Sequence, residues 1–450
     1  MRPSTSPTID VGSLLDSAPW TTFQKLITTL AALAVIFDGF DIQILAFAVP
    51  SLIRDWHAVR ADFAPVLAIG LTGMVIGGPL AGYLGDRIGR RLALIACVTV
   101  FGLATIATSF IHGLTGLALL RFITGLGAGG AVPNATALAA EFAPFRRRPT
   151  AVKLTIVCIP LGGMLGGLIA ARVLPAFGWR ALYMIGGALP LLLALILWQA
   201  LPESPRFLAG RAPRWPELTR LLTRMGHNFP PDATFEDRTE RVKANRVSLR
   251  SLFAPELLRD TSGLWFAFFF CLGSIYLVFS WLPALLTANG LNVATASSAL
   301  AVYNFGGVIG VLLFTVVTAM FGSRRPMLIG ALAAAVSALS LLLIPIAAPG
   351  GLTLLLAGLA VQGFLANTIQ TAMYALAAHV YPTGIRATGV AYSAAIGRTG
   401  ALFTSFFGAA IIQAGASAYW STLAIAMVCT FAGLAAVRHH FPATAKATVA

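Results

Sequence analysis

The chain has 450 residues, of which 58% are hydrophobic and only 10% are charged, and its formal net charge is +15. Charged residues make up about 25% of soluble globular proteins, so this composition excludes a soluble fold and indicates a membrane protein with many spans. The apolar runs are continuous and do not alternate with polar residues, which excludes a β-barrel and predicts transmembrane helices.

Hydropathy predicts an all-α membrane protein with twelve spanning helices. A polar N-terminal tail (1–22) precedes the first span, and we expect it to be mobile. The only long polar stretch is a linker (201–260), which separates an N-terminal six-helix bundle (23–200) from a C-terminal one (261–437) that ends in a tail (438–450). The expected spans are residues 25–49, 64–84, 92–111, 115–139, 151–174, 180–200, 262–287, 297–321, 327–347, 352–377, 387–413 and 418–437.

The two halves of the chain repeat each other. Gly73 and Gly77 in the first half recur at a constant offset as Gly306 and Gly310 in the second half. Parallel six-helix repeats that face one central site are a design of transporters. The repeat therefore predicts two bundles related by a pseudo-two-fold axis.

Two carboxylates, Asp38 and Asp41, lie inside the first expected span. A charged side chain near the bilayer centre costs about 2.5 to 3.5 kcal/mol, so it needs a function or a partner. Because they are three residues apart, both fall on one helix face, which must point into protein or water. We predict that they carry protons. The alternative is a buried structural pair that an arginine from another helix satisfies.

A turn rich in glycine and charge follows the second expected span. Its residues are Gly85, Asp86, Arg87, Ile88, Gly89, Arg90 and Arg91. The glycines permit tight turns and close approach of the backbone. In a chain of twelve spans the turn resembles the signature loop of the major facilitator superfamily, and this resemblance implies a gating element that latches the outward-open state. Ala319 and Met320 replace the Asp-Arg pair in the second half, so we expect an asymmetric latch.

The fourth expected span carries Arg121 followed by a glycine-rich run. Arg121 lies about 10 Å from the outer end of its span, at a depth comparable to that of Asp38 and Asp41, which makes an ion pair between them feasible. Members of the superfamily have an arginine in a similar helix that is associated with proton coupling. The alternative is a charge pair that only ties helices together.

Other charged segments at the ends of spans also resemble superfamily signatures. They include the turn after the fourth span and the run that follows the sixth span. The resemblance implies that their charges form networks on the cytoplasmic side while the two halves rock. The further gating residues that we infer from it are Glu141, Arg147, Glu203, Arg206 and Arg386.

Arg398, in the eleventh expected span, is the main candidate for substrate binding. It lies twelve residues beyond Arg386, or roughly 18 Å, and therefore close to the midplane. From residue 261 onward the chain contains no Asp or Glu. A planar guanidinium binds a carboxylate through two hydrogen bonds, so we predict that Arg398 holds a substrate carboxylate. The alternative is a permanent pair with an aspartate of the first half. The other candidates for substrate binding are Asn304, Gln370, Tyr303, Trp281 and Tyr392.

The distribution of the 31 Lys and Arg residues predicts the orientation. Most of them lie on the same side of the membrane as the N-terminus, and the loops of the other side hold only Arg54, Arg60, Arg172 and Arg180. The positive-inside rule therefore places both termini in the cytoplasm. Because the basic residues are scattered along one membrane face, nucleic acid is not an expected partner. The four cysteines have no metal-ligand spacing, and we expect no metal site.

The run Asp38-Gly39-Phe40-Asp41, together with residues 281–291 and 381–389, resembles the aromatic acid:proton symporter family of the major facilitator superfamily. The resemblance covers all twelve expected spans. It implies a carrier of the bacterial inner membrane, expected to be monomeric, that imports benzoate-type or hydroxybenzoate-type acids with protons. The proton gradient would supply the energy and no cofactor would be needed. The alternative is a facilitator, or an exporter of other organic anions or amphipathic compounds. No nucleophile or metal constellation in the sequence supports a membrane enzyme.

Overall fold

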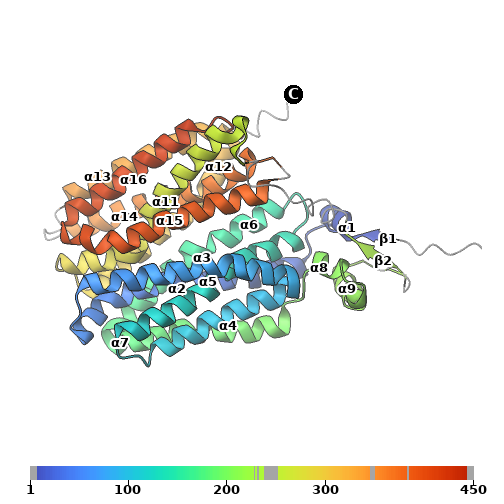
Figure 1. Ribbon diagram of the computed structural model, residues 1–450, viewed down its shortest axis with the longest axis horizontal. Helices are drawn as coiled ribbons and strands as arrows, with labels where there is room; N and C mark the ends of the chain where they lie inside the picture. Colours follow the sequence, from blue (N-terminus) through green and yellow to red (C-terminus); the bar gives the residue numbers. More distant parts are fainter. Residues whose placement is uncertain are drawn as a thin grey trace, which may run out of the picture.

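The computed structural model describes residues 8–227, 229–230, 233–237, 252–344, 350–382 and 385–442, apart from the side chains of residues 315, 319, 386 and 387. The long helices lie side by side in one elongated bundle, and a small appendage of short helices and strands lies at one end (Figure 1). We call this end of the bundle the linker end, because the appendage contains part of the linker. The opposite end is called the far end.

Long helices form the N-terminal half of the bundle. They are α2 (Thr22–Trp56), α3 (Phe63–Ile88), α4 (Arg90–Thr108), α5 (Leu114–Phe142), α6 (Arg148–Ile156) and α7 (Cys158–Ala200), with a short η1 (Arg60–Asp62) before α3. The first of them begins at a capping box, in which Thr21 Oγ1 accepts the Gln24 N–H at 3.3 Å and Gln24 Oε1 accepts the Thr21 N–H at 2.8 Å. These bonds satisfy donors that would otherwise be unpaired at the start of the span.

Two spans share the stretch from α6 to α7. The continuous segment Arg148–Ala200 has 53 residues, which as a straight helix would be about 80 Å long, far more than one bilayer crossing. Gly178 interrupts it with φ 76° and ψ −179°. This left-handed conformation favours glycine and lets the chain leave the helix between the fifth and the sixth span. Among the described residues, eleven helices are long and apolar enough to cross a membrane, and one of them thus contains two spans.

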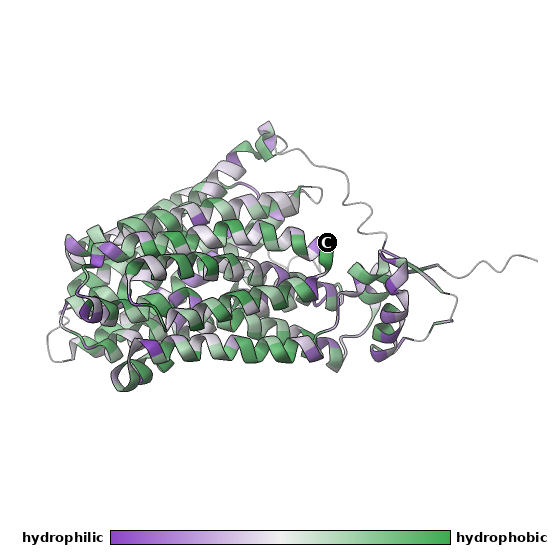
Figure 2. Cartoon of the chain, turned by 60° about the horizontal axis from the view of Figure 1, so that its bottom comes forward, coloured by the Kyte–Doolittle hydropathy of each residue, from purple (hydrophilic) through white to green (hydrophobic). Residues whose placement is uncertain are grey.

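The C-terminal half has a matching set of helices. They are α11 (Pro255–Ala288), α12 (Val293–Phe321), α13 (Arg324–Ser340) with η4 (Leu341–Leu343), α14 (Gly351–Val380), α15 (Arg386–Gln413) and α16 (Ala416–Ala436). Hydrophobic residues dominate the bundle, and hydrophilic residues concentrate at its ends and in the appendage (Figure 2). The chain is therefore an all-α, multi-pass membrane protein, as the sequence predicts.

The appendage joins the N-terminal segment to the linker. It consists of β1 (Thr8–Asp10), α1 (Val11–Ser17), α8 (Pro205–Ala209), η2 (Ala212–Arg214), α9 (Trp215–Arg224) and β2 (Thr234–Glu236). The two strands pair in parallel, with Ile9 opposite Phe235. Val11 and Leu15 of α1 are buried in the same hydrophobic cluster as Leu218 of α9. Residues 8–21, which we expected to be mobile, are therefore ordered, because the linker supplies both a strand and an apolar surface for them.

The two halves pack together at the far end and separate toward the linker end. One hydrophobic cluster joins far-end residues of α2 and α7, such as Phe47 and Tyr183, to residues of the C-terminal half such as Trp281. A second cluster surrounds Ile27 at the linker end of α2. Among the described residues, this second cluster contains only members of the N-terminal half, the N-terminal segment and the linker. The far end is thus the closed end in this conformation.

Candidate functional site

Asp41 of α2 and Arg121 of α5 form a buried ion pair. Arg121 Nη2 lies 3.1 Å from Asp41 Oδ1, and Arg121 Nη1 donates to the Asp41 backbone carbonyl at 3.2 Å. Thr105 of α4 donates its hydroxyl to the same carboxylate at 2.7 Å. A hydrogen-bonded pair of opposite charges can be buried, whereas either charge alone would be very costly. The ion pair that the sequence made feasible is present, and it joins three helices of one half.

Asp38 lies one helical turn away from Asp41 in a different environment. Its side chain is fully buried, and neither carboxylate oxygen has a hydrogen-bond partner among the described residues. Asp41 and Arg398 are the charged residues that interact with it electrostatically. Burial of an ionised carboxylate without a hydrogen-bond donor is expensive, so this conformation favours an uncharged Asp38. The two aspartates therefore differ in their partners, although sequence reasoning gave them the same role.

Arg398 of α15 reaches across from the C-terminal half to the N-terminal half. Its Nη1 lies 3.3 Å from the point that a Cβ atom on Gly78 of α3 would occupy, and the Gly129 carbonyl oxygen of α5 lies 3.2 Å from that point. The absence of a side chain at Gly78 thus makes room for the guanidinium. Among the described residues, Arg398 makes no hydrogen bond and no ion pair, and it is only partly buried. A cation at the boundary of the halves is therefore available to an anionic ligand.

Two tyrosines and a small apolar cluster lie near Arg398. Tyr276 of α11 and Tyr374 of α14 both interact electrostatically with it. Tyr276 also packs against a small cluster in which Met74 of α3 meets Ala401 of α15. The combination of one cation with aromatic rings suits a ligand that is apolar over most of its surface and carries one negative charge. The sequence does not single out the two tyrosines, because tyrosine in a spanning helix is more often interfacial.

Asn304 of α12 is bound to the other half of the molecule. Its Nδ2 donates to Gln43 Oε1 of α2 at 2.8 Å, and Gln43 Nε2 donates back to Asn304 Oδ1 at 3.3 Å. Both side chains are fully buried. A Cβ atom on Gly163 of α7 would lie 2.1 Å from Gln43 Nε2 and 2.8 Å from Asn304 Nδ2, so only glycine fits there. We call this pair the amide clasp. It ties the halves together near the far end. It also supplies hydrogen-bond partners for the Asn304 amide, which we had expected to bind the substrate.

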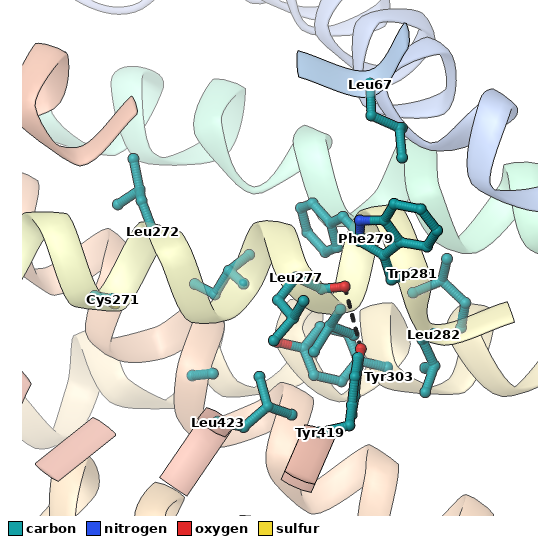
Figure 3. Packing of buried hydrophobic residues seen from close by; sticks show 14 of the residues in the cluster. Leu67, Cys271, Leu272, Leu277, Phe279, Trp281, Leu282, Tyr303, Tyr419 and Leu423 are labelled. Atoms are coloured by element: carbon teal, nitrogen blue, oxygen red, sulfur yellow. Dashed lines mark hydrogen bonds between the residues drawn. The ribbon is translucent and has the colours of Figure 1, made fainter. Parts of the chain in front are cut away.

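The other side chains expected at the substrate differ in how deeply they are buried. Trp281 and Tyr303 are fully buried in the hydrophobic cluster that joins the halves (Figure 3), where Trp281 Nε1 donates to the Ser405 carbonyl at 2.9 Å. Tyr392 is 40% exposed and stacks on Trp265 with ring centroids 6.4 Å apart. Gln370 is a partly buried residue of α14. We leave Trp281 and Tyr303 out of the candidate site, because a side chain enclosed by packing cannot contact a ligand.

The turn between α3 and α4 is tied to neighbouring segments of the N-terminal half. Asp86 and Arg90 form an ion pair at 2.5 Å, and Arg90 Nε lies 3.7 Å from Glu141 Oε1 at the end of α5. The Arg87 guanidinium lies over the Tyr83 ring at 4.8 Å. Gly85 lies so close to α5 that a Cβ there would be 2.3 Å from Asn134 Oδ1. The expected gating charges Asp86, Arg90 and Glu141 thus form one network.

Glu203 anchors the turn from the other side. Its Oε1 accepts the backbone N–H of Arg91 at 3.1 Å and that of Ser204 at 2.9 Å. The Arg91 side chain donates to the Trp198 carbonyl and lies over its indole. Burial raises the pKa of the Glu203 carboxyl above its ordinary value, and the two backbone N–H donors oppose that rise by stabilising the carboxylate.

Arg206 belongs to a second network, which reaches the N-terminal segment. It donates to Asp16 Oδ1 at 3.0 Å and to Asp237 Oδ2 of the linker at 3.1 Å. Arg148 donates to the same Asp16 oxygen at 2.5 Å. Arg147, the residue we had selected in this turn, is exposed, and its neighbour Arg148 makes the ion pair. Arg386 begins α15, and its side chain lies outside the described part of the structure.

Gly89 is expected to be the least replaceable residue of the turn. Its φ of 109° is strained for any L side chain, and a Cβ there would lie 2.0 Å from Glu203 Oε2. We expect Gly89→Ala to destabilise the protein by about 2 kcal/mol or more, since a positive φ alone costs roughly 1–3 kcal/mol. Thermal unfolding of the purified protein measures this. Gly82→Ala in the preceding helix α3 is the matched control, because no atom outside its chain neighbours and its own helix backbone lies within 4 Å of its Cβ position. Equal unfolding temperatures for the two variants would contradict the expectation.

Comparisons with known proteins agree with this architecture. Residues 31–347 and 264–448 match the model of the Major Facilitator Superfamily. A gallate transporter of Pseudomonas putida is 36% identical over 419 residues, which cover 92% of this chain and 91% of that protein. The 4-hydroxybenzoate transporter PcaK of Acinetobacter baylyi is 35% identical over 433 residues, 95% of this chain and 93% of that protein. The partially occluded inward open structure of the xylose transporter XylE from E. coli has a TM-score of 0.70 at 20% identity, and the match covers 91% of this chain and 97% of that one.

Proposed function

Because the chain belongs to the major facilitator superfamily, and the relatives that it matches are transporters and not enzymes, we propose that it imports a small aromatic carboxylate together with protons. The observation that carries this proposal is the unpaired guanidinium of Arg398 at the boundary between the halves. The gallate and 4-hydroxybenzoate transporters that resemble the chain support the class of substrate.

The carboxylate of the substrate binds Arg398 in this proposal. The C-terminal half contains no Asp or Glu from residue 261 onward, so this guanidinium has no acid of its own half to pair with. The aromatic ring lies between Tyr276 and Tyr374, both of which interact electrostatically with Arg398. Aromatic rings prefer edge-to-face or offset contacts worth about 0.5–1.5 kcal/mol beyond the area that they bury. These contacts select an aromatic acid over an aliphatic acid.

Asp38 carries the coupled proton. It is buried, lacks a hydrogen-bond donor among the described residues and interacts electrostatically with Arg398. After substrate and proton have been released, an ionised Asp38 compensates the charge of Arg398 while the empty carrier reorients. When the substrate carboxylate takes that role, Asp38 binds a proton, and the loaded carrier reorients without an uncompensated buried charge. Asp41 remains paired with Arg121 throughout and holds the helices in place.

The linker end faces the cytoplasm of a bacterial cell in this proposal. The excess of Lys and Arg at that end supports the orientation through the positive-inside rule. The closed far end and the separated linker end then correspond to an inward-facing carrier. The protein works as a monomer in the inner membrane, without a cofactor, and takes its energy from the proton gradient.

Reconstituted vesicles test the proposal. We expect labelled 4-hydroxybenzoate or gallate to accumulate against its concentration gradient when the vesicle lumen is made alkaline, and a protonophore to abolish the accumulation. Labelled xylose serves as the negative control. Counterflow without any accumulation would identify a facilitator instead, and accumulation under the opposite proton gradient would identify an exporter.

The amide clasp is expected to control opening at the far end. Asn304→Ala removes both cross-half hydrogen bonds and leaves the buried Gln43 amide without this partner, which costs about 1–3 kcal/mol in the closed conformation. We therefore expect faster labelling by an impermeant maleimide of a cysteine placed at Ser297, which packs against Gly167 beside the clasp. Asn367→Ala is the matched control, since Asn367 Nδ2 donates to Gly363 of its own helix.

The same pair of variants separates the clasp from a binding role for Asn304. If Asn304→Ala leaves the labelling rate unchanged and weakens substrate binding, Asn304 contacts the substrate after all. Labelling is measured relative to the protein without the cysteine at position 297, because four native cysteines are present.

A further inference from the structure

We propose that a crevice at the linker end binds the headgroup of an anionic phospholipid. The crevice has a volume of about 880 Å³ and lies between the segment before α2 and the turn that joins α5 to α6. Residues 16–20, Lys25 and residues 144–147 line it. We call it the basic crevice. It is separate from the site around Arg398.

The charge of the basic crevice is positive and uncompensated. Lys25, Arg146 and Arg147 are exposed, and among the described residues their side chains form no ion pair. Asp16 is the one acidic residue in the lining, and it is already shared by two arginines, Arg148 at 2.5 Å and Arg206 at 3.0 Å. The three other cations are therefore available to an anion.

Hydrogen-bond donors in the basic crevice suit a phosphate group. Trp20 Nε1 is buried and has no acceptor among the described residues. The nine-residue helix α6 begins at this turn, but its start offers few free donors, because the Arg148 N–H bonds to the Pro144 carbonyl at 2.9 Å and Pro149 has no N–H. The donors that suit phosphate oxygens are therefore the guanidinium groups of Arg146 and Arg147. Three cations and a tryptophan whose indole N–H lacks an acceptor among the described residues thus line one concave surface.

The position of the basic crevice favours a lipid over a soluble anion. Trp20 and Lys25 stand where the chain enters the first span, and Phe145, which is 65% exposed, stands just after the fourth. Tryptophan and other aromatic rings beside lysine or arginine are typical of the level at which lipid headgroups lie. Phe145 gives the acyl chains an apolar contact while the phosphate occupies the crevice. The ligand class is therefore an anionic phospholipid such as phosphatidylglycerol.

Native mass spectrometry of the purified full-length protein tests the proposal. The quantity measured is the affinity for the first molecule of phosphatidylglycerol that binds. We expect Arg146→Gln/Arg147→Gln to weaken this binding about 30-fold, on the order of fivefold per arginine. The matched control is Arg324→Gln/Arg325→Gln, two exposed adjacent arginines at the start of α13. This control is expected to bind as the wild type does, and phosphatidylcholine is expected to bind all three proteins weakly and equally.

Two results would overturn the proposal. One is an equal affinity for phosphatidylglycerol in the crevice variant and the control variant. The other is displacement of the lipid by inorganic phosphate or glycerol phosphate at comparable concentrations, which would assign the crevice to a soluble anion. Thermal unfolding verifies that the variants are folded, which we expect because neither replaced arginine has a side-chain partner. Because no transport is measured, the result of this experiment is independent of the proposed transport function.

Discussion

Replacement of Arg398 by alanine is expected to abolish binding of the aromatic acid. Two charge-assisted hydrogen bonds to a carboxylate contribute about 1.5–3 kcal/mol each, so the affinity should fall by at least about 100-fold. Arg398→Lys keeps the charge but loses the planar fork, and we expect a loss of roughly 10- to 100-fold. Equilibrium binding of labelled 4-hydroxybenzoate to the purified protein measures both effects.

The structure supplies a matched control for this experiment. Arg324 is an exposed arginine at the start of α13, at the linker end of the same half, and it is far from Arg398 along the chain. Its replacement by alanine removes the same charge and should leave the affinity within a few-fold of the wild type. If Arg398→Ala also binds with wild-type affinity, the carboxylate is held elsewhere and the proposed substrate site is wrong.

The two aspartates of α2 are expected to fail in different ways. Asp38→Asn resembles the uncharged side chain that its buried environment favours, so the protein should fold and exchange substrate in counterflow. Gradient-driven accumulation should be lost, because the variant cannot exchange a proton. Asp41→Asn instead leaves Arg121 buried without its ion-pair partner. That change should destabilise the protein by about 3–5 kcal/mol, which thermal unfolding detects.

A double-variant cycle distinguishes structure from coupling at Asp41. Because Asn and Gln are neutral and hydrogen-bonding, Asp41→Asn combined with Arg121→Gln should recover part of the lost stability. Full accumulation by Asp38→Asn would exclude Asp38 as the proton carrier. If an Asp41→Asn protein has normal stability but loses accumulation, Asp41 is the proton carrier.

Composition and periodicity predict the spans and the general position of the charges, because both depend on local sequence. Asp41 and Arg121 lie at similar depths along their helices, which was enough to predict that an ion pair between them is feasible, and the pair is present. Depth does not give the rotation of one helix against another, however. The same reasoning could not distinguish Asp38 from Asp41, which share a face but differ in whether a donor is within reach.

Contacts between the halves were the least predictable. Asn304 and Gln43 are 261 residues apart, and nothing local indicates that they meet. Trp281 is an aromatic residue of a kind that often binds ligands, yet it is fully buried in the hydrophobic cluster that joins the halves. The order of residues 8–21 likewise depends on pairing with a three-residue strand of the linker, which carries no periodic signal. In each case the residue that determines the side chain's environment is distant in the sequence.

The complete absence of acidic residues beyond position 260 has a consequence for how such a carrier can change over evolutionary time. Asp38 and Asp41 belong to one half, and Arg398 with Tyr276 and Tyr374 belongs to the other. If the proposed roles are correct, mutations in the second half can change the preferred substrate without disturbing the aspartates that respond to the proton gradient. Energy conversion and substrate selectivity would then be inherited on separate stretches of the gene.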